Sequence, residues 1–380
     1  MSTSLLLKGF EVELFTGRDT GENVGVAIDV MKDFPDFVNE PDHRNLEYIT
    51  APIADYTRLA TALTEPRRRL RIWLAKRDLT LLPGSTLSLG DSSRFERSDP
   101  GNPYHDLIET RYGTRVVTAS IHINLGIKDL DWLFAAVRLV RCEAALFLAL
   151  SASSPFLDGS STGRHSQRWH QFPITPGKVP LFKDHQHYVT WVQQQLASGA
   201  MCNERHLWTS VRPNGPRRPY SLNRLELRIC DLVTDPRELL AITALLELRL
   251  IALRNNASEL DPLLSSSLTP SELASLSDAN DAAAASASLD AELHHWRNGE
   301  PIQSRTWIRQ LLEELAPLAR DLNLDSHLKP LAAVLSGGNQ AMRWQTAHED
   351  GAEISELLRS GIITMASQEQ FSPVLDGILG

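Results

Sequence analysis

Four short segments of the chain alternate apolar and polar residues with a period of two. In FEVEL (residues 10–14), Glu11 and Glu13 alternate with three apolar residues. Side chains along a β-strand point to opposite faces in turn, so each segment predicts a strand with one face on a core and one polar face. The other three segments are RNLEYIT (44–50), ASIHINLG (119–126) and NRLELRIC (223–230).

Longer segments repeat their apolar residues every three to four positions, which predicts helices. The first covers residues 56–77 and contains Pro66, where we expect a kink. The second, 129–151, is apolar on most sides and predicts a buried helix. The pattern is helical almost throughout from residue 235 onward, and the Ala/Ser-rich stretch 280–293 predicts an exposed or weakly packed helix.

These patterns predict an α+β fold, and a chain of 380 residues is long enough for either one large unit or two domains. Strands and helices are mixed in a sheet-rich part at 1–235, and helices dominate at 236–380. A run of arginines at 67–71 lies in the first predicted helix without interleaved aromatic residues. We therefore interpret that run as a solvated helix face rather than as a polyanion-binding patch.

The polar faces of the four strands carry acids, arginines, asparagines and a histidine, but no lysine. This set of residue types leaves two interpretations open. Either the polar face is exposed to water, as in many antiparallel sheets, or it binds ligands. Carboxylates suit a hard cation such as Mg²⁺, and arginines among them suit an anionic substrate or a transferring phosphoryl group. The polar residues are Glu11 and Glu13; Asn45 and Glu47; Ser120, His122 and Asn124; and Arg224, Glu226 and Arg228.

Composition narrows the possible partners and compartment. The formal charge of −9 argues against a general nucleic-acid binder. Three cysteines without a CxxC spacing favour a reducing compartment, and we expect neither a signal peptide nor a membrane span, so the protein is expected to be cytoplasmic.

Cys230 ends the fourth strand segment on its polar side. A catalytic thiol is possible there, but a small residue that fills the strand end is the favoured interpretation.

A glycine- and serine-rich loop precedes a second group of polar residues, GRHSQRWHQFP (163–173), which includes Arg164 and Arg168. Binding residues often lie in such loops. The chain has neither a Walker A loop nor a GxGxxG motif before a helix, so a nucleotide would have to be held in another way.

Eight pieces of the sequence, taken in order, resemble the carboxylate–amine ligase family that includes the family-2 glutamate–cysteine ligases, most closely those of the cyanobacterial type. The pieces are FEVEL, EPDHRNLEY, PGSTLSLGD, TASIHINLGI, LALSASSPFLDG, STGRHSQRW, SVRPNG and LELRICD. The resemblance implies a glutamine-synthetase-like fold, in which a curved antiparallel sheet carries helices on its outer face, and it implies that residues 1–380 form a single catalytic domain.

The resemblance also implies a reaction and its cofactors. ATP, with Mg²⁺, would phosphorylate the γ-carboxylate of L-glutamate, and the amine of L-cysteine would then form γ-glutamylcysteine, the first step of glutathione biosynthesis. The implied partners are therefore small molecules, with neither nucleic acid nor membrane. Carried over by position, Glu11, Glu13, Glu47, His122 and Glu226 are metal ligands, Arg228 and Arg164 are catalytic, and Arg168, Arg212 and Asn124 bind substrate.

Three alternatives stay open at this point. The chain could join glutamate to an amine other than cysteine, because no residue indicates a thiol pocket by its spacing. It could be a guanidino kinase, which would release no inorganic phosphate, or a binding protein without ATP turnover. The chain also departs from the family at one place: many family members have an arginine in the helical segment that reads NDAAAASASLDAEL here (280–293), so the resemblance assigns no function to that helix.

Overall fold

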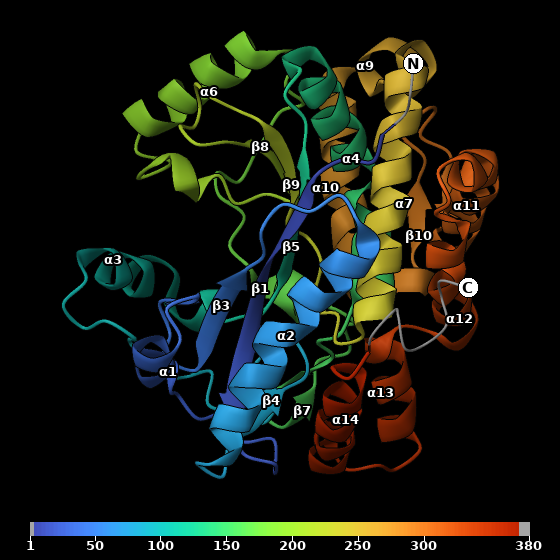
Figure 1. The fold of residues 1–380 in the computed structure, drawn as a ribbon. Coiled ribbons are helices and arrows are strands. Elements are labelled where there is room, and N and C mark those ends of the chain that lie inside the picture. Colours follow the sequence, from blue (N-terminus) through green and yellow to red (C-terminus); the bar gives the residue numbers. More distant parts are fainter. Residues whose placement is uncertain (1–3, 372–380) are drawn as a thin grey trace.

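The computed structural model describes residues 4–371 and contains an antiparallel sheet with helices packed against it (Figure 1). The strand order is β2-β3-β1-β5-β9-β8, and β4 pairs with the far end of β1. The predicted α+β class is confirmed. The sheet consists of β1 (Lys8–Gly17), β2 (Phe37–Asn39), β3 (Asn45–Ile49), β4 (Thr80–Leu82), β5 (Ile121–Gly126), β8 (Val211–Asn214) and β9 (Arg224–Leu227).

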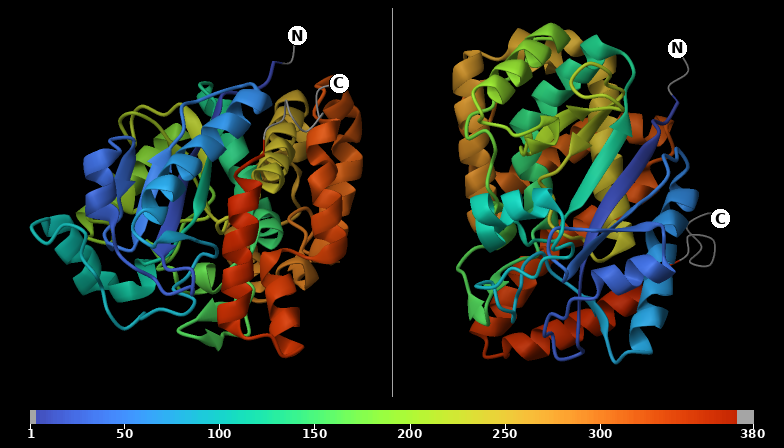
Figure 2. Two further views of the ribbon diagram at one scale, coloured as in Figure 1. Left: turned by 60° about the horizontal axis from the view of Figure 1, so that its bottom comes forward. Right: turned by 90° about the vertical axis from the view of Figure 1, so that its left-hand side faces the viewer.

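The remaining elements surround this sheet, and two further hairpins pair β6 (Phe156–Leu157) with β7 (Ser160–Ser161) and β10 (Glu292–His294) with β11 (Pro301–Gln303). Helices dominate after residue 235, and the two views of Figure 2 show them beside the sheet. The helices are α1 (Ala27–Asp33), α2 (Tyr56–Ala75), α3 (Pro103–Tyr112), α4 (Leu130–Ser151), α5 (Gln167–Gln171), α6 (His185–Ala197), α7 (Pro236–Asn255), α8 (Ala257–Leu260), α9 (Pro262–Ser265), α10 (Pro270–Ala287), α11 (Ser304–Asp321), α12 (Asp325–Gly337), α13 (Gln340–Glu349) and α14 (Ile354–Gln368).

The apolar strand residues form one core with α2, α4 and α7. Each of these three helices begins at an aspartate whose side chain accepts a hydrogen bond from a main-chain N–H of the first turn, which stabilises the helix start. α4 is buried along almost its whole length, as its apolar sequence predicts. The three capping residues are Asp55, Asp129 and Asp235.

A buried ion pair joins the first strand to the helical part of the chain. The Nζ of Lys8 lies 2.9 Å from the carboxylate of Glu247 on α7, and both side chains are fully buried. The hydroxyl of Tyr56 donates to the same carboxylate at 2.8 Å. Burial lowers the pKa of Lys8, although Glu247 acts to raise it. A charge buried this way is tolerated only because its partner is present.

The arginine run in α2 differs from the prediction of a solvated face. Arg67 is buried and donates to the hydroxyl of Tyr48 and to the carbonyl of Thr234. Arg71 makes a two-pronged ion pair with the buried carboxylate of Glu369. The helical period therefore turns part of this run toward the core, where the arginines tie α2 to the sheet and to the C-terminal helix.

The Ala/Ser-rich stretch was also wrongly predicted as an exposed or weakly packed helix. Its first half belongs to α10, which buries Ala284 and Ala285 against its neighbours and packs along α4. Small side chains let two helices approach closely, so alanine and serine here indicate a tight contact. The second half continues into a short 3₁₀ turn (Ser288–Asp290) and β10.

Within residues 4–371, no helix combines the length and apolar character needed to cross a membrane.

Candidate active site

Five glutamates and one histidine gather on the polar face of the sheet and on the chain that leads from β2 to β3. We call this group the acidic cluster. Strand pairing places Glu11 opposite His122 and Glu13 opposite Glu47, so three strands present these groups on one face. The predicted convergence of polar side chains is therefore seen in the structure. The members of the acidic cluster are Glu11, Glu13, Glu40, Glu47, Glu226 and His122.

His122 lies at the centre of the acidic cluster. Its Nδ1 is 2.9 Å from a carboxylate oxygen of Glu11, and its Nε2 is 3.1 Å from the hydroxyl of Ser120. That hydroxyl donates its single hydrogen to Glu13 at 2.8 Å, so it accepts from Nε2. Nδ1 thus faces both the Glu11 carboxylate and, at 3.4 Å, the guanidinium of Arg228, and the ring lies between Glu11 and Glu13.

Glu226 is the fully buried member of the acidic cluster, and its charge is already compensated. Arg212 donates to it twice, at 2.8 and 3.0 Å, and Arg228 donates at 2.5 Å. The amide of Asn214 donates to it as well. Burial acts to raise the pKa of Glu226, but the two guanidinium groups hold it well below its usual range. In this structure Glu226 is an anion at any pH near neutrality.

Glu47 is in the opposite situation, because its neighbours are also acids. Burial raises its pKa well above the usual range, and Glu40, Glu11 and Glu13 add to the shift. Burial also raises the pKa of Glu40, which shares a hydrogen bond with Glu47. With all of these acids ionised, this end of the acidic cluster would carry more negative charge than the adjacent arginines balance, so a bound cation would favour the ionised form.

Sequence reasoning missed Glu40 as a site residue. It lies in the turn between β2 and β3, outside the segments in which apolar and polar residues alternate, so the alternation does not identify it. The available signal was its position as the first residue of EPDHRNLEY, the piece from which Glu47 was assigned.

The donor set of the acidic cluster fits a hard divalent cation. One ligand atom each from Glu11, His122 and Glu226 lie within 4.8 Å of one another. Carboxylate oxygens are the protein ligands that Mg²⁺ prefers, and it commonly shares them with substrate phosphates. The excess of negative charge around Glu47 points to the same class of ligand. No sulfur ligand lies among the groups described here, which disfavours a structural zinc site.

Two further predicted residues adjoin the acidic cluster. The amide of Asn124 donates to Glu11 at 3.3 Å, and its oxygen accepts from Arg224 at 3.0 Å. Arg228 reaches Glu226 and lies 3.4 Å from Nδ1 of His122. The structure therefore brings Asn124, Arg212 and Arg228 together with the predicted metal ligands.

Arg168 and Arg164 are placed differently. The Arg168 guanidinium is buried and donates to the carbonyls of Ile229 and Arg228, so it holds the end of β9 rather than facing open space. The guanidinium of Arg164 donates to the carbonyl of Thr162, and none of its contacts among the described residues reaches the acidic cluster. Their assigned roles as substrate clamp and catalytic residue stay predictions.

Cys230 lies behind the sheet's polar face. It is fully buried, and its thiol points at the carbonyl of Phe147. Burial raises the pKa of Cys230 to about 12, so the thiol stays protonated. This geometry agrees with the favoured interpretation of a small residue that fills the strand end, and a thiolate nucleophile is disfavoured.

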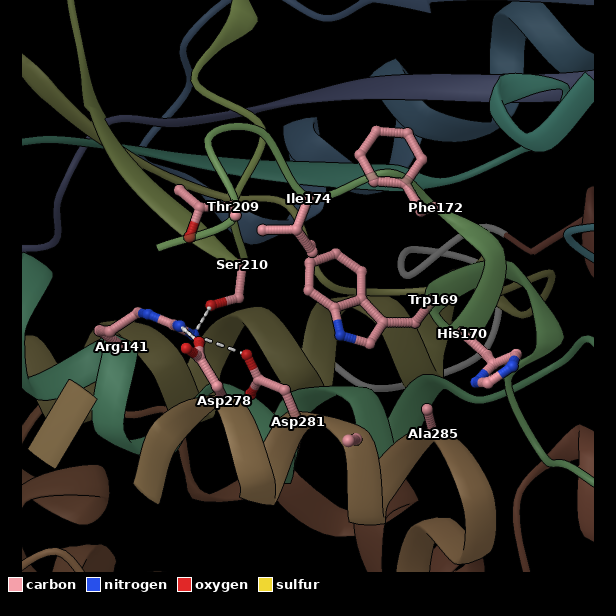
Figure 3. Close-up of a pocket in the computed structure, with 12 residues that line it drawn as sticks. Arg141, Trp169, His170, Phe172, Ile174, Thr209, Ser210, Asp278, Asp281 and Ala285 are labelled. Carbon is pink, nitrogen blue, oxygen red and sulfur yellow. Dashed lines mark hydrogen bonds and ion pairs between the residues drawn. The ribbon is translucent and has the colours of Figure 1, made fainter. Parts of the chain in front are cut away.

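A cavity of about 280 Å³ lies beside the end of the sheet, between α4, α10 and the chain that follows α5 (Figure 3). Ser210 lines the cavity and directly precedes β8, and its carbonyl accepts a hydrogen bond from the main-chain N–H of Arg228 at 2.8 Å. Trp169 forms part of its wall and directly follows Arg168. The acidic cluster is the candidate active site, and this main-chain hydrogen bond connects it to the cavity.

Comparison with known families gives one match over nearly the whole chain. The family model described as "Glutamate-cysteine ligase family 2(GCS2)" matches residues 7–360. A protein of Gloeobacter violaceus named "Putative glutamate--cysteine ligase 2" is 25% identical over 329 residues, which cover 84% of each chain. "Putative glutamate--cysteine ligase 2-1" of Rubrobacter xylanophilus is 25% identical over 366 residues, which cover 92% of each.

Two solved structures are similar in fold. The glutamate–cysteine ligase of Francisella tularensis, solved in complex with AMP, has a TM-score of 0.72 at 12% identity and covers 99% of this chain and 95% of that one. A bifunctional glutathione synthetase from Pasteurella multocida has a TM-score of 0.71 at 15% identity, with 96% of this chain and 53% of that one covered. This chain therefore spans about half of the bifunctional protein, and at these identities the likeness concerns the fold alone.

Proposed function

Because the chain belongs to glutamate–cysteine ligase family 2, we propose that it is an ATP-dependent ligase that joins the γ-carboxylate of L-glutamate to an amine. The γ-phosphoryl group of ATP passes to a carboxylate oxygen, and ADP leaves. The amine nitrogen then attacks the carbonyl carbon of the γ-glutamyl phosphate; the C–N bond forms, inorganic phosphate leaves, and the amine's proton passes to solvent. The observation that carries this proposal is the convergence of acids from three strands beside Arg228.

In this proposal the acidic cluster binds Mg²⁺. Glu11, His122 and Glu226 supply the ligand atoms that lie closest together, and Glu13 and Glu47 supply further carboxylates around them. Bound Mg²⁺ would cancel repulsion between the triphosphate and the glutamate carboxylate. Because Glu226 is held by Arg212 and Arg228, it presents its oxygens in a fixed position.

The predicted arginines and Asn124 have four different roles in the proposal. Arg228 stabilises the charge on the transferred phosphoryl group, since it adjoins the acidic cluster on the side of the cavity. Arg212 and Asn124 orient the substrate and the metal ligands. Arg168 acts on the substrate through the main chain of Arg228 and Ile229, directly after β9, to which it donates hydrogen bonds, and Arg164 remains a catalytic candidate from the resemblance alone.

The amine predicted from the sequence is L-cysteine, which would make the product γ-glutamylcysteine and the reaction the first step of glutathione biosynthesis. A different amine is the second candidate. One observation favours it: among the described residues that line the cavity, Arg141 is the only arginine or lysine, and it is already paired. The α-carboxylate of cysteine would lack a cationic partner there.

Trapping with hydroxylamine tests the phosphorylation step without any assumption about the amine. Hydroxylamine attacks an acyl phosphate directly, so purified protein with glutamate, ATP and Mg²⁺ should form γ-glutamyl hydroxamate and ADP. Glu11→Gln should reduce hydroxamate formation at least a hundredfold, because it removes a full charge from the metal site, an effect of about 2.7 kcal/mol. Glu300→Gln changes an exposed glutamate outside the site and serves as the matched control.

Three results would contradict the proposal. Reversible phosphorylation of a guanidine without release of inorganic phosphate would identify a guanidino kinase instead. Binding of ATP without formation of ADP or hydroxamate would identify a binding protein without ATP turnover. Hydroxamate formation by Glu11→Gln at the rate of the Glu300→Gln control would remove the assignment of Glu11.

A further inference from the structure

The cavity beside the acidic cluster has one apolar wall and one acidic end. The rings of Trp169 and Phe172 and the side chain of Ile174 line the wall, and alanines of α10 lie opposite. In Figure 3 the Trp169 ring lies in the middle of the cavity, and Arg141 and Ser210 lie at one end. A ligand that fits must therefore combine an apolar body with a polar group at that end.

The charges at the acidic end favour a cation. Arg141 donates to Asp281 at 2.6 Å, to the hydroxyl of Ser210 at 2.7 Å, and to Asp278. Two carboxylates thus surround one guanidinium, which leaves one negative charge uncompensated. Burial lowers the pKa of His170, which also lines the cavity, so this ring adds no positive charge near neutral pH. The positive charge of Arg164, which does not line the cavity, lowers the pKa of His170 further.

Three buried polar atoms in the lining lack partners. The Oδ1 of Asp281, the hydroxyl of Thr209 and the Nε–H of Arg141 make no hydrogen bond to any group that the structure describes. All three residues are more than nine-tenths buried. A buried unpaired acceptor costs about 1–3 kcal/mol, so a donor delivered by a ligand would be favourable. An ammonium group offers three such donors and has no acceptor.

The aromatic wall supports the same ligand class. The face of an indole attracts a cation by about 0.5–2 kcal/mol, and it packs equally well against a hydrocarbon. A carboxylate would meet Asp278, Asp281 and a ring face. The one guanidinium of the described lining, Arg141, already donates to both aspartates and has only its Nε–H without an acceptor. The cavity therefore discriminates against amino acids.

We infer that this cavity binds a primary amine that has an apolar body and no carboxylate. The inference rests on the proposed ligase, for which this amine is the nucleophile. Its position is suitable, because Ser210 joins the acidic end of the cavity to the main chain of Arg228. Cysteine would then be a poor substrate, and the product would be a γ-glutamyl amide of an apolar amine.

Three matched probes test the inference by direct binding, without ATP or glutamate. Phenethylamine carries the amine alone, phenylalanine adds the α-carboxylate, and 3-phenylpropionate carries the carboxylate alone. Isothermal titration should show that phenethylamine binds at least tenfold more tightly than phenylalanine, and that 3-phenylpropionate does not bind. Equal binding of phenethylamine and phenylalanine would overturn the inference.

Two variants locate the binding in the cavity. Ala282 is exposed and lines the cavity, so Ala282→Leu should fill part of it and abolish phenethylamine binding. Ala279→Leu makes the same change at an exposed position of α10 outside the lining and should bind normally. Asp278→Asn should weaken binding about fivefold, the upper range for a partly exposed ion pair. Undiminished binding by Ala282→Leu would overturn the assignment.

The hydroxylamine assay separates this inference from the proposed function. Hydroxamate formation without phenethylamine binding would refute the inference and leave the ligase intact. Phenethylamine binding without hydroxamate would leave an amine-binding cavity and refute the ligase. If both hold, glutamate, ATP and Mg²⁺ should release phosphate faster with phenethylamine than with phenylalanine, and faster with cysteamine than with cysteine.

Discussion

Two substitutions of glutamate by glutamine within the acidic cluster should have very different effects on stability. Glu226 is fully buried and accepts four hydrogen bonds, three of them from Arg212 and Arg228. Glu226→Gln leaves two buried guanidinium groups without a counter-charge. Removing one partner of a buried ion pair costs about 3–5 kcal/mol, and we expect a loss of that size in the free energy of unfolding.

Glu11→Gln should change the same free energy by less than about 1 kcal/mol. It loses the charge that faces His122, but it also relieves repulsion from Glu226, which acts to raise the pKa of Glu11. The side chain is 20% exposed, so solvent screens both effects. On balance the pKa of Glu11 is lowered, so its charge favours the folded state, but the partial exposure of the side chain keeps the loss small and the fold should be retained.

Equilibrium denaturation in urea, followed by circular dichroism without added metal, measures both values. Wild type and Glu300→Gln provide the reference. Equal losses in Glu11→Gln and Glu226→Gln would refute the reasoning, because Glu226 is fully buried between two guanidinium groups, whereas Glu11 is partly exposed and is also repelled by Glu226. The comparison also has a practical use: Glu11→Gln is the variant whose lost activity reports on metal binding rather than on folding.

Three further predictions concern metal, protons and thiols. Mg²⁺ should raise the unfolding temperature of wild type, and Glu47→Gln should reduce that gain, since burial and neighbouring acids raise the pKa of Glu47 and a cation relieves this; an equal gain in both proteins would contradict the site. Burial lowers the pKa of His206 from its ordinary value of 6.5, so near that pH the unfolded chain binds more protons than the folded chain, and stability falls as the pH falls. His206→Gln should reduce this loss in the free energy of unfolding between about pH 7.5 and about pH 5.5 by up to about 1.4 kcal/mol. An unchanged loss, measured by urea denaturation, would refute the prediction. A thiol reagent at about pH 8 should modify Cys202 in the native protein but all three cysteines after denaturation, because burial raises the pKa of Cys142 and of Cys230 to about 12; rapid native reaction of either would contradict their burial.

Local pattern was sufficient to predict the polar faces. The alternation in FEVEL and in ASIHINLG assigns Glu11 and His122 to one side of their strands whatever the strands pair with. The capped, apolar helices α2, α4 and α7 were predictable for the same reason, since their signals lie within one turn or one face. The sequence period therefore identified most of the acidic cluster.

Long-range contacts were beyond this reasoning. Nothing local indicates that Arg212 meets Glu226 on the neighbouring strand, or that Arg168 bonds main-chain carbonyls some 60 residues away in the chain. The packing of α10 on α4 depends on which faces meet, and alanine suits both an exposed helix and a tight contact. Glu40 was missed because it lies in a turn, where the sequence has no regular alternation of apolar and polar residues.

The ion pair between Lys8 and Glu247 has a consequence for how the gene can be divided. A fragment that ends near residue 235 would keep Lys8 but lose its counter-ion, and it would expose the surfaces of α2 and α4 that α7 covers. The complementary fragment would keep Glu247 without Lys8, its buried partner. We expect each piece to precipitate when expressed by itself, and the two to be recovered together only when co-expressed, as halves of a single cooperative unit.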